Sequence, residues 1–262
     1  MIHPWRRSLA AILFPLSLAL PAHAADAPKP GEQAAEHFEK QVPVTLDYQL
    51  YLPAEYGKDT GKKWPLIMFL HGSGESGSDV NKVKTHGPPK LIAQNADSPV
   101  KQFIVVSPQC PAARQGWNVF SLNALLDDVL AKYSVDQDRV YLTGLSMGGF
   151  GTWEWASRNS DRFAAIAPMC GGGNPANVRR LATLPIWVFH GDADPTVPVK
   201  NSDDMVEALK KANADVKYTR YPGVGHDCWT RSYNNSELFE WMLTHKRGEP
   251  RATPAPATPK AN

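Results

Sequence analysis

Residues 140–156 read VYLTGLSMGGFGTWEWA, which is an apolar run, a serine flanked by glycines and an aromatic run of helical character. That order is typical of a nucleophile elbow, a strained turn that lifts a serine hydroxyl above the end of a sheet strand. Side chains two positions before and after such a serine would collide with the backbone, and Gly144 and Gly148 have none. We therefore predict that Ser146 ends a strand and begins a helix. For the bare pattern, an ordinary glycine-rich turn is the alternative.

Short apolar runs alternate with helical patterns on both sides of this stretch. The alternation predicts an α/β fold, with a mostly parallel sheet whose strands are joined by crossover helices. Several runs are apolar without alternation, as in strands that are buried on both faces. The predicted strands are Thr45–Leu52, Pro65–Leu70, Phe103–Ser107, Val140–Thr143, Phe163–Pro168, Ile186–His190 and Val216–Tyr221.

Helices are predicted where apolar residues recur at steps of three and four, namely Leu122–Tyr133, Met205–Leu209 and Leu238–Met242. The segment between the strands that end at Pro168 and begin at Ile186 is too short for a large helical lid. We therefore expect an open cleft, walled mainly by the long loops Gly72–Pro99 and Pro108–Ser121.

The N-terminus predicts export. Arg6 and Arg7 precede the apolar block Leu9–Leu20, which ends in Ala22-His23-Ala24, so residues 1–24 have the pattern of a cleaved signal peptide. Twin-arginine export and a transmembrane anchor are weaker alternatives. Residues 25–247 would then form one domain, and the Pro-, Ala- and Thr-rich residues 248–262 a disordered tail. The predicted location is periplasmic or secreted.

The charge balance limits the classes of partner. The chain has 28 Lys and Arg against 26 Asp and Glu, and removing the two arginines of the signal leaves equal numbers. A nucleic-acid groove or a basic membrane patch needs a local positive excess, so we expect neither, and small neutral or weakly charged substrates fit better.

Three cysteines, Cys110, Cys170 and Cys228, would enter an oxidising compartment after export. One disulfide with one free thiol is possible, and so are three small buried residues without any bond. The spacing contains no zinc-type cluster, so no metal and no cofactor are expected.

A serine nucleophile needs a base, and the base needs an acid that fixes its tautomer. Asp192 and Asp194 follow the strand that ends at His190, and His226 lies on a glycine-rich segment after the last strand. Asp194 is the better acid because it lies further out before a proline, whereas Asp192 is placed to hold a turn. Serine, acid, histidine is the chain order of the α/β-hydrolase arrangement. A calcium loop is disfavoured because its glycine and final glutamate are missing.

An oxyanion also needs donors, and His71-Gly72-Ser73-Gly74 follows the second predicted strand with free backbone amides. We predict the N–H groups of Ser73 and Met147 as the pair, with Gly74 as an alternative to Ser73. We expect His71 to pin this loop rather than to act as a second base.

Five stretches together carry a family resemblance between about Tyr48 and His245. They are PLIMFLHGSGESG (65–77), SPQCP (107–111), RVYLTGLSMGGFGTW (139–153), PIWVFHG (185–191) and HDCW (226–229). In these the chain resembles secreted bacterial α/β-hydrolase carboxylesterases of the phospholipase/carboxylesterase type, including predicted peptidases and relatives of feruloyl and polyhydroxyalkanoate-type esterases. The resemblance implies Ser146 as nucleophile, Asp194 as acid and His226 as base.

Two departures qualify the resemblance. Some feruloyl esterases pair a cysteine directly before the nucleophile with one beside the histidine, but here Leu145 precedes Ser146 and Cys228 lies two positions after His226. The oxyanion loop reads His-Gly-Ser-Gly instead of the His-Gly-Gly-Gly of many lipases, so a true lipase is not expected.

Aromatic residues near the predicted mouth suggest the substrate. Trp117 and Trp229 would stack on flat or sugar-linked acyl esters, and Gln109 would line the same cleft, although all three could instead serve the scaffold. The sequence thus predicts an exported serine esterase that acts on a small-molecule ester. A serine peptidase and a non-catalytic binding module on the same scaffold are the alternatives, and the oligomeric state stays open.

Overall fold

A computed structural model describes residues 39–248. The predicted signal at 1–24 and the predicted tail beyond Gly248 lie outside the described residues. Contacts divide the chain after Pro43, and residues 39–43 contain no helix or strand, so every described element belongs to the unit that begins at Val44. Within residues 39–248, no helix has both the length and the apolar character needed to cross a membrane.

The core of this unit is a seven-stranded sheet in the order β1-β3-β2-β4-β5-β6-β7. β1 pairs antiparallel with β3, and the other pairs are parallel. The sheet therefore confirms the predicted α/β fold with its mostly parallel strands. The strands are β1 Tyr48–Tyr51, β2 Trp64–Leu70, β3 Ile104–Pro108, β4 Val135–Leu145, β5 Ala165–Met169, β6 Ile186–Gly191 and β7 Val216–Tyr221.

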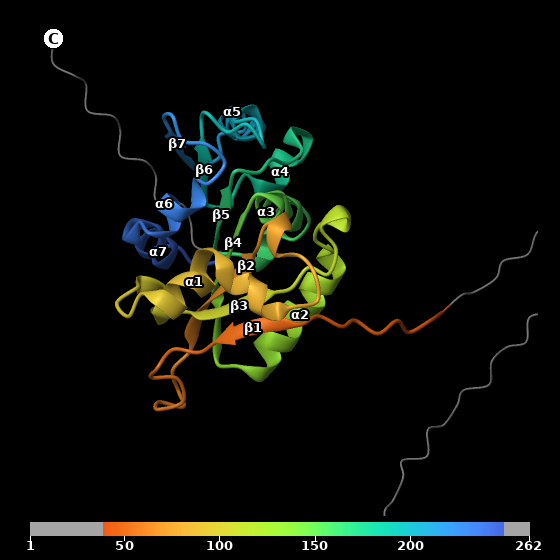
Figure 1. Cartoon of the computed structure of the whole chain (residues 1–262). Helices are drawn as coiled ribbons and strands as arrows, with labels where there is room; N and C mark the ends of the chain where they lie inside the picture. Colours follow the sequence, from red (N-terminus) through yellow and green to blue (C-terminus); the bar gives the residue numbers. More distant parts are fainter. Residues whose placement is uncertain (1–38, 249–262) are drawn as a thin grey trace, which may run out of the picture. The chain divides into compact units, whose positions relative to one another are not determined.

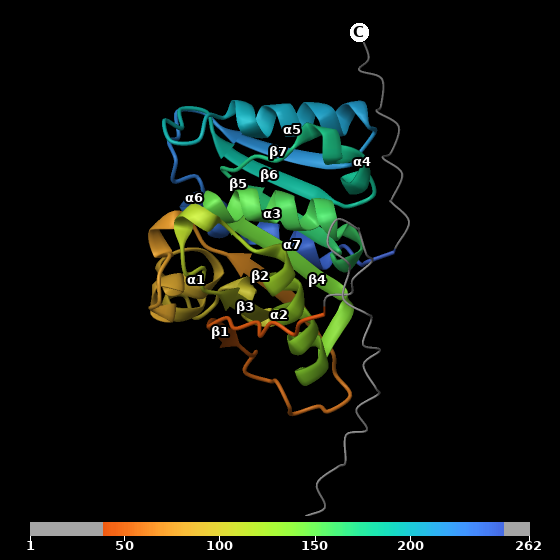
Figure 2. The same cartoon turned by 90° about the vertical axis from the view of Figure 1, so that its right-hand side faces the viewer.

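Helices cover both faces of the sheet (Figures 1 and 2). On one face lie α2 (Val119–Lys132), α3 (Met147–Arg158), α4 (Val178–Leu181) and α5 (Lys200–Lys211), and on the other α1 (Gly87–Gln94), α6 (Trp229–Tyr233) and α7 (Ser236–Leu243). Successive residues of β2 serve the two layers in turn, because Leu66 and Met68 pack with the first group of helices and Ile67 and Phe69 with the second.

Six short 3-10 helices complete the described elements: η1 Ser73–Glu75, η2 Val80–Thr85, η3 Pro99–Gln102, η4 Ala113–Gln115, η5 Ser160–Arg162 and η6 Pro175–Asn177. The segment between β5 and β6 contains only η6 and α4, in line with the expected absence of a large lid.

Strand ends differ from the prediction by up to a few residues, and two predictions differ most, each for a physical reason. β4 begins at Val135 instead of Val140. The prediction missed residues 136–139 because they are polar, and in this part of the strand only Val135 is paired, with Trp64. The segment Gly72–Pro99 is not an open loop but folds into η1, η2 and α1. Pro88 and Pro89, which suggest a turn, lie in the first turn of α1, where a missing N–H costs nothing.

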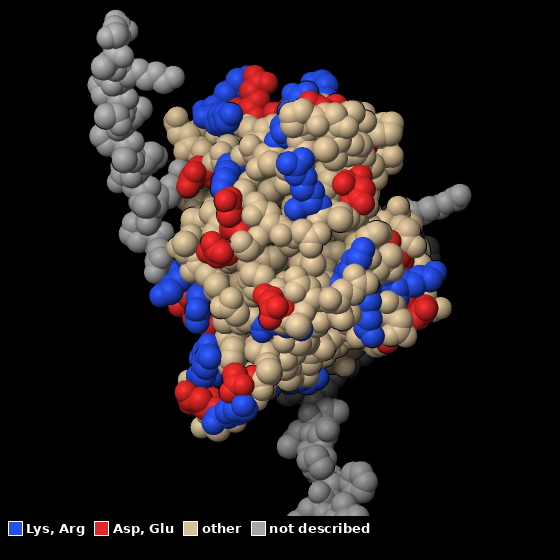
Figure 3. Space-filling model, turned by 60° about the vertical axis from the view of Figure 1, so that its left-hand side comes forward, with Lys and Arg blue, Asp and Glu red and all other residues tan. Residues whose placement is uncertain are grey.

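The face of the molecule in Figure 3 carries mixed charge. Lys and Arg side chains are interspersed there with Asp and Glu and separated by uncharged surface. On this face, charges of one sign do not gather into a single patch, so nothing in it concentrates a charged ligand.

Candidate active site

The turn between β4 and α3 has the strained backbone that the sequence predicts. Ser146 has φ 52° and ψ −117°, outside the regions favoured by residues with side chains, and its N–H donates to Met169 O at 3.0 Å. A Cβ on Gly144 would lie 2.4 Å from Gly148 O, and one on Gly148 would lie 1.9 Å from Leu70 O. Both glycines are therefore required by close backbone approach.

Three side chains from separate loops meet at the carboxyl edge of the sheet. His226 Nε2 lies 2.9 Å from Ser146 Oγ, and His226 Nδ1 lies 2.7 Å from Asp194 Oδ2. A carboxylate can only accept, so Nδ1 carries the proton and Nε2 is left to accept the proton of the serine hydroxyl. The three residues thus form a connected chain of hydrogen bonds that could make the hydroxyl a nucleophile.

Asp194 is held as an anion. Its Oδ1 accepts the backbone N–H groups of Thr196 and Val197 at 2.8 and 2.9 Å. Burial on its own raises the pKa of Asp194, but the hydrogen bonds from His226, Val197 and Thr196 outweigh burial and lower the pKa below its ordinary value. The acid therefore stays ionised at neutral pH, opposite the imidazole that would become positive.

Asp192 shapes the loop that carries His226, which matches the turn role expected of it. Its Oδ1 accepts the N–H of Gly223 at 2.6 Å, and its own N–H donates to Tyr221 O at 3.0 Å. The same loop passes over Gly191, where a Cβ would lie 2.2 Å from Val224 O. The sequence HGDAD therefore supplies both a carboxylate for His226 and the surface on which the loop of His226 rests.

The two predicted oxyanion donors lie beside the serine. Ser73 and Met147 line the same cavity as Ser146. Ser73 is the first residue of η1 and Met147 the first residue of α3. First-turn N–H groups have no acceptor within their own helix, so both can face a ligand.

His71 pins this loop, as expected. Cys110 N–H donates to its Nε2 at 3.0 Å, so the ring proton is on Nδ1, which donates to Gly72 O at 2.6 Å. Burial lowers the pKa of His71, and the hydrogen bond to Gly72 and the nearby Glu75 carboxylate offset only part of that effect. The ring is thus a neutral clamp between two loops.

Glu75 also holds the loop, and it does not follow from the sequence reasoning above. Its Oε2 accepts the N–H of Gly72 at 3.0 Å, while its carbonyl oxygen accepts the side-chain amide of Gln109 at 2.7 Å. The sequence feature that could have indicated this role is the three-residue spacing from Gly72 to Glu75, which is the spacing of a capping box. Gln109 is buried and hydrogen-bonds this loop, and it lines an adjoining cavity instead of the one that contains Ser146.

The two predicted tryptophans have different surroundings. Trp117 lines the cavity of Ser146 and packs edge-on to His71, with ring centroids 4.9 Å apart. Trp229 is buried and packs edge-on to His226 at 5.1 Å and to His86 at 5.5 Å. Trp229 therefore supports the back of the histidine ring.

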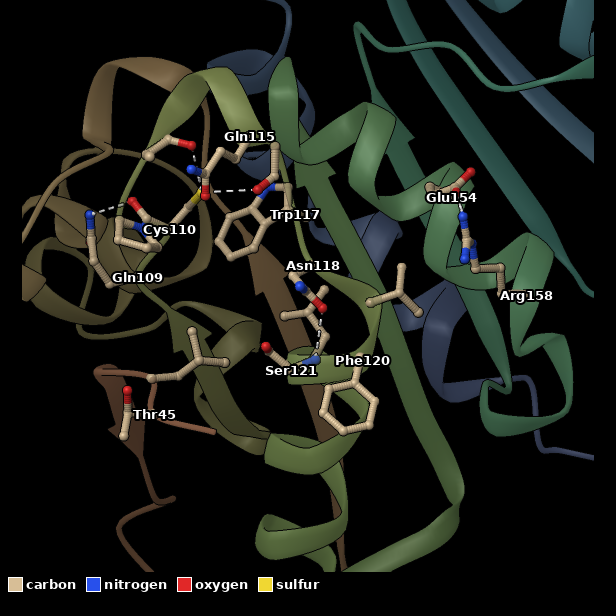
Figure 4. A pocket seen from close by; sticks show the side chains of 16 residues that line it. Thr45, Gln109, Cys110, Gln115, Trp117, Asn118, Phe120, Ser121, Glu154 and Arg158 are labelled. Carbon is tan, nitrogen blue, oxygen red and sulfur yellow. Dashed lines mark hydrogen bonds and ion pairs between the residues drawn. The ribbon is translucent and has the colours of Figure 1, made fainter. Parts of the chain in front are cut away.

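Two cavities lie side by side at this edge. The cavity of Ser146 measures about 480 Å³, and an adjoining one of about 520 Å³ shares Gln115, Gly116, Trp117 and Glu154 with it. Figure 4 shows the adjoining cavity, with Phe120 on α2 and the ion-paired Glu154 and Arg158 on α3. The walls come from the segment 109–121, as expected, but also from α3, whereas the segment 72–99 contributes Ser73 to the Ser146 cavity.

The three cysteines are free and buried, so the structure contains none of the disulfides that the sequence allowed. Burial raises the pKa of the Cys110 and Cys170 thiols, which keeps both protonated. Among residues 39–248, no group of His, Cys, Asp and Glu has the arrangement of a metal site.

Comparisons with known proteins find similar hydrolases and esterases. The model of the dienelactone hydrolase family matches residues 112–238, a range that includes Ser146, Asp194 and His226. A solved structure described as a thermostable esterase aligns with a TM-score of 0.67 and 32% identity, over 77% of this chain and 60% of that chain.

Two curated relatives carry esterase names. A bifunctional acetylxylan esterase/xylanase from Neocallimastix patriciarum is 25% identical over 78% of this chain and 29% of its own length. A probable feruloyl esterase C from Aspergillus terreus is 27% identical over 64% of this chain and 62% of its own length. The chain thus spans less than two thirds of either relative.

Proposed function

We propose that the chain hydrolyses carboxylic esters through an acyl-enzyme on Ser146, because it has the α/β-hydrolase fold and its residues 112–238 match the dienelactone hydrolase family. The observation that carries the proposal is the pair of hydrogen bonds that link Ser146 Oγ to His226 Nε2 and His226 Nδ1 to Asp194 Oδ2. No cofactor is required by this chemistry.

The reaction begins when His226 Nε2 takes the proton of Ser146 Oγ as the oxygen attacks the ester carbonyl carbon. Asp194 stabilises the imidazolium that forms. The carbonyl oxygen becomes an anion beside the N–H groups of Ser73 and Met147, each of which is worth about 3–4 kcal/mol in the transition state by analogy with measured oxyanion donors. His226 then gives its proton to the leaving alcohol, and water, activated by His226, releases the acid from Ser146.

We infer that the substrates are short-chain, aryl or sugar-linked esters. The cavity of Ser146 is lined by the rings of Trp117 and Phe150 together with the polar Gln115 and Glu154. Aromatic rings favour flat or sugar-like groups, and Glu154 adds no net charge to the wall because it is paired with Arg158. The names of the relatives above are consistent with this class.

We also propose that the protein is exported, on the pattern of residues 1–24 alone. Detection of a mature N-terminus at Ala25 in the periplasm or medium tests this, and retention of residues 1–24 in the cytoplasm contradicts it.

The test of the reaction is turnover of p-nitrophenyl acetate and butyrate by wild type and Ser146→Ala. We expect the variant to lose at least about a thousandfold in kcat, with fluorophosphonate labelling of wild type only. Ser236→Ala, an exposed serine on α7, is the matched control and retains full activity. Equal rates in wild type and Ser146→Ala contradict the esterase, and faster cleavage of an anilide with the same acyl group favours the peptidase. A wild type inert towards both favours the binding module.

A further inference from the structure

A second histidine lies against the acid of the proposed triad, and the mechanism above does not use it. His190, in β6, has no exposed surface. Its Nε2 is 2.9 Å from Val197 O and 3.2 Å from Asp194 Oδ2, the same oxygen that faces His226. Asp194 Oδ2 is thus bracketed by two imidazole rings.

The surroundings of the ring fix where its protons lie. Nε2 faces a carbonyl oxygen and a carboxylate oxygen, which only accept, so Nε2 carries a proton. Nδ1 lies 2.7 Å from Ser202 Oγ, a hydroxyl that can either donate to Nδ1 or accept from it. The ring therefore points an N–H at Val197 and Asp194 in every charge state.

Ser202 connects the ring to the segment that follows β5, beside the serine elbow. Ser202 Oγ lies 3.0 Å from Gly171 O, and a Cβ on Gly171 would lie 2.5 Å from Gly149 C in the first turn of α3. The contacts run from the elbow through Gly171 and Ser202 to His190. A change of ring position would therefore be resisted at both ends.

We propose that His190 is a positioning residue that holds Asp194 in register with His226. Two backbone N–H groups hold Asp194 Oδ1, and the His190 N–H lies near the other oxygen, Oδ2. The same N–H contacts Val197 O, and Val197 supplies one of the two N–H groups on Oδ1. A carboxylate that turns away from His226 Nδ1 leaves the imidazole free to rotate. The inference rests on the proposed esterase reaction for its effect on rate.

Two isosteric variants separate the two ring nitrogens. His190→Gln places a carboxamide N–H near the position of Nε2, whereas His190→Asn reaches only the position of Nδ1. With p-nitrophenyl acetate we expect Asn to lower kcat about tenfold to a hundredfold with KM changed by less than about twofold, and Gln to restore most of that loss. A residue that only supports the fold would instead lower the active fraction and leave kcat per active site unchanged. Burst titration counts the active sites.

A proton NMR experiment measures positioning without turnover. The low-field resonance of the His226 Nδ1 proton, assigned by its absence in His226→Gln, is expected in wild type and His190→Gln and lost or shifted upfield in His190→Asn. If wild type shows no turnover that depends on Ser146, the esterase proposal fails while this comparison still decides the role of His190.

Ser202→Ala provides a second variant should His190→Asn fail to fold. It removes the partner of Nδ1 and is expected to lower kcat by about threefold to tenfold, with a broadened resonance. The proposal is overturned if the low-field resonance and kcat per active site match wild type in His190→Asn, or in Ser202→Ala where the Asn variant does not fold. It is equally overturned if Gln and Asn lower kcat alike.

Discussion

The turn that carries Ser146 and the wall of the adjoining cavity lie next to each other but are held in different ways. In the turn, residues 144–149, backbone approaches backbone so closely that Gly148 could not carry a Cβ without meeting Leu70 O at 1.9 Å. In the wall, residues 109–121, the contacts are ordinary hydrogen bonds: Gln109 N–H donates to Asp47 O at 2.8 Å, and the Cys110 thiol lies 3.3 Å from Gly116 O, the nearer of its two carbonyl acceptors. Thiols are weak donors.

Under the proposed function, the turn would govern the rate of the reaction and the wall would govern which ester binds. A turn fixed by backbone contacts keeps the Ser146 hydroxyl in one place, and it tolerates few substitutions. A wall held by hydrogen bonds at ordinary distances leaves room for other side chains, so its residues can change without disturbing that turn. Substitutions in the turn should therefore lower stability and kcat strongly. Substitutions in the wall should have smaller effects, mainly on KM.

Gly148→Ala has the largest expected effect, because the new methyl group overlaps Leu70 O and the backbone of α3 or β2 must move. We expect a loss of at least about 3 kcal/mol in the free energy of unfolding and no measurable esterase activity. Urea denaturation followed by circular dichroism measures the first. Gly61→Ala, where the nearest atom would be Asp59 Oδ1 at 3.4 Å, is the control and should remain near wild type. Equal stability of both variants would contradict the rigid turn.

Glu75→Ala tests the loop that lies between the two regions. Removing the acceptor of the Gly72 N–H frees the segment that presents Ser73, so kcat for p-nitrophenyl acetate should fall about tenfold with little change in KM. Glu75→Gln keeps an acceptor and should recover most of the rate. An unchanged kcat in Glu75→Ala would show that Gly72 needs no partner.

His71 gives the loop a pH-dependent stability. Because burial lowers its pKa in the folded state, the unfolded chain takes up a proton at a higher pH than the folded chain. His71 therefore reduces stability as pH falls through the ordinary histidine range near about 6.5, until the folded pKa is reached. Thermal melts of wild type and His71→Gln between about pH 8 and 5 should show a shallower decline for the variant. Parallel curves would contradict a neutral buried ring.

Phe120→Ala has the smallest expected effect on the fold. The side chain is 70% exposed on the rim of the adjoining cavity, so stability should stay within about 0.5 kcal/mol of wild type. Hydrolysis of p-nitrophenyl acetate should be unchanged, while KM for an extended aryl or sugar ester should rise a few-fold. A loss of kcat for the acetate would mean that wall and turn are coupled.

The elbow could be predicted because its requirement is local. Strand, glycines and serine are adjacent in the chain, and the strained turn at Ser146 requires the flanking glycines that make the pattern recognisable. Asp194 and His226 could be proposed because parallel strands bring their carboxyl ends to one edge. The buried strands were readable for the same reason, since apolar runs need no knowledge of their neighbours.

The residues that support the site could not be read in this way. His190 belongs to an apolar strand, and its contacts with Ser202 and Val197 exist only after β6 and α5 have packed. For Gln109 the sequence left two roles open, in the cleft or in the scaffold, and only the fold shows that its amide donates to Glu75 O. Such contacts depend on which loops meet, which no single stretch of sequence specifies.

Three unpaired sulfur atoms enclosed within the fold have a practical consequence. Cys110, Cys170 and Cys228 are at most 3% exposed, so a maleimide or mercurial reagent added to the native domain finds no accessible target. Because no disulfide has to form, refolding from urea needs neither a glutathione couple nor a disulfide isomerase. Non-native disulfides can form only while the chain is unfolded. A reductant is therefore useful during purification but unnecessary afterwards.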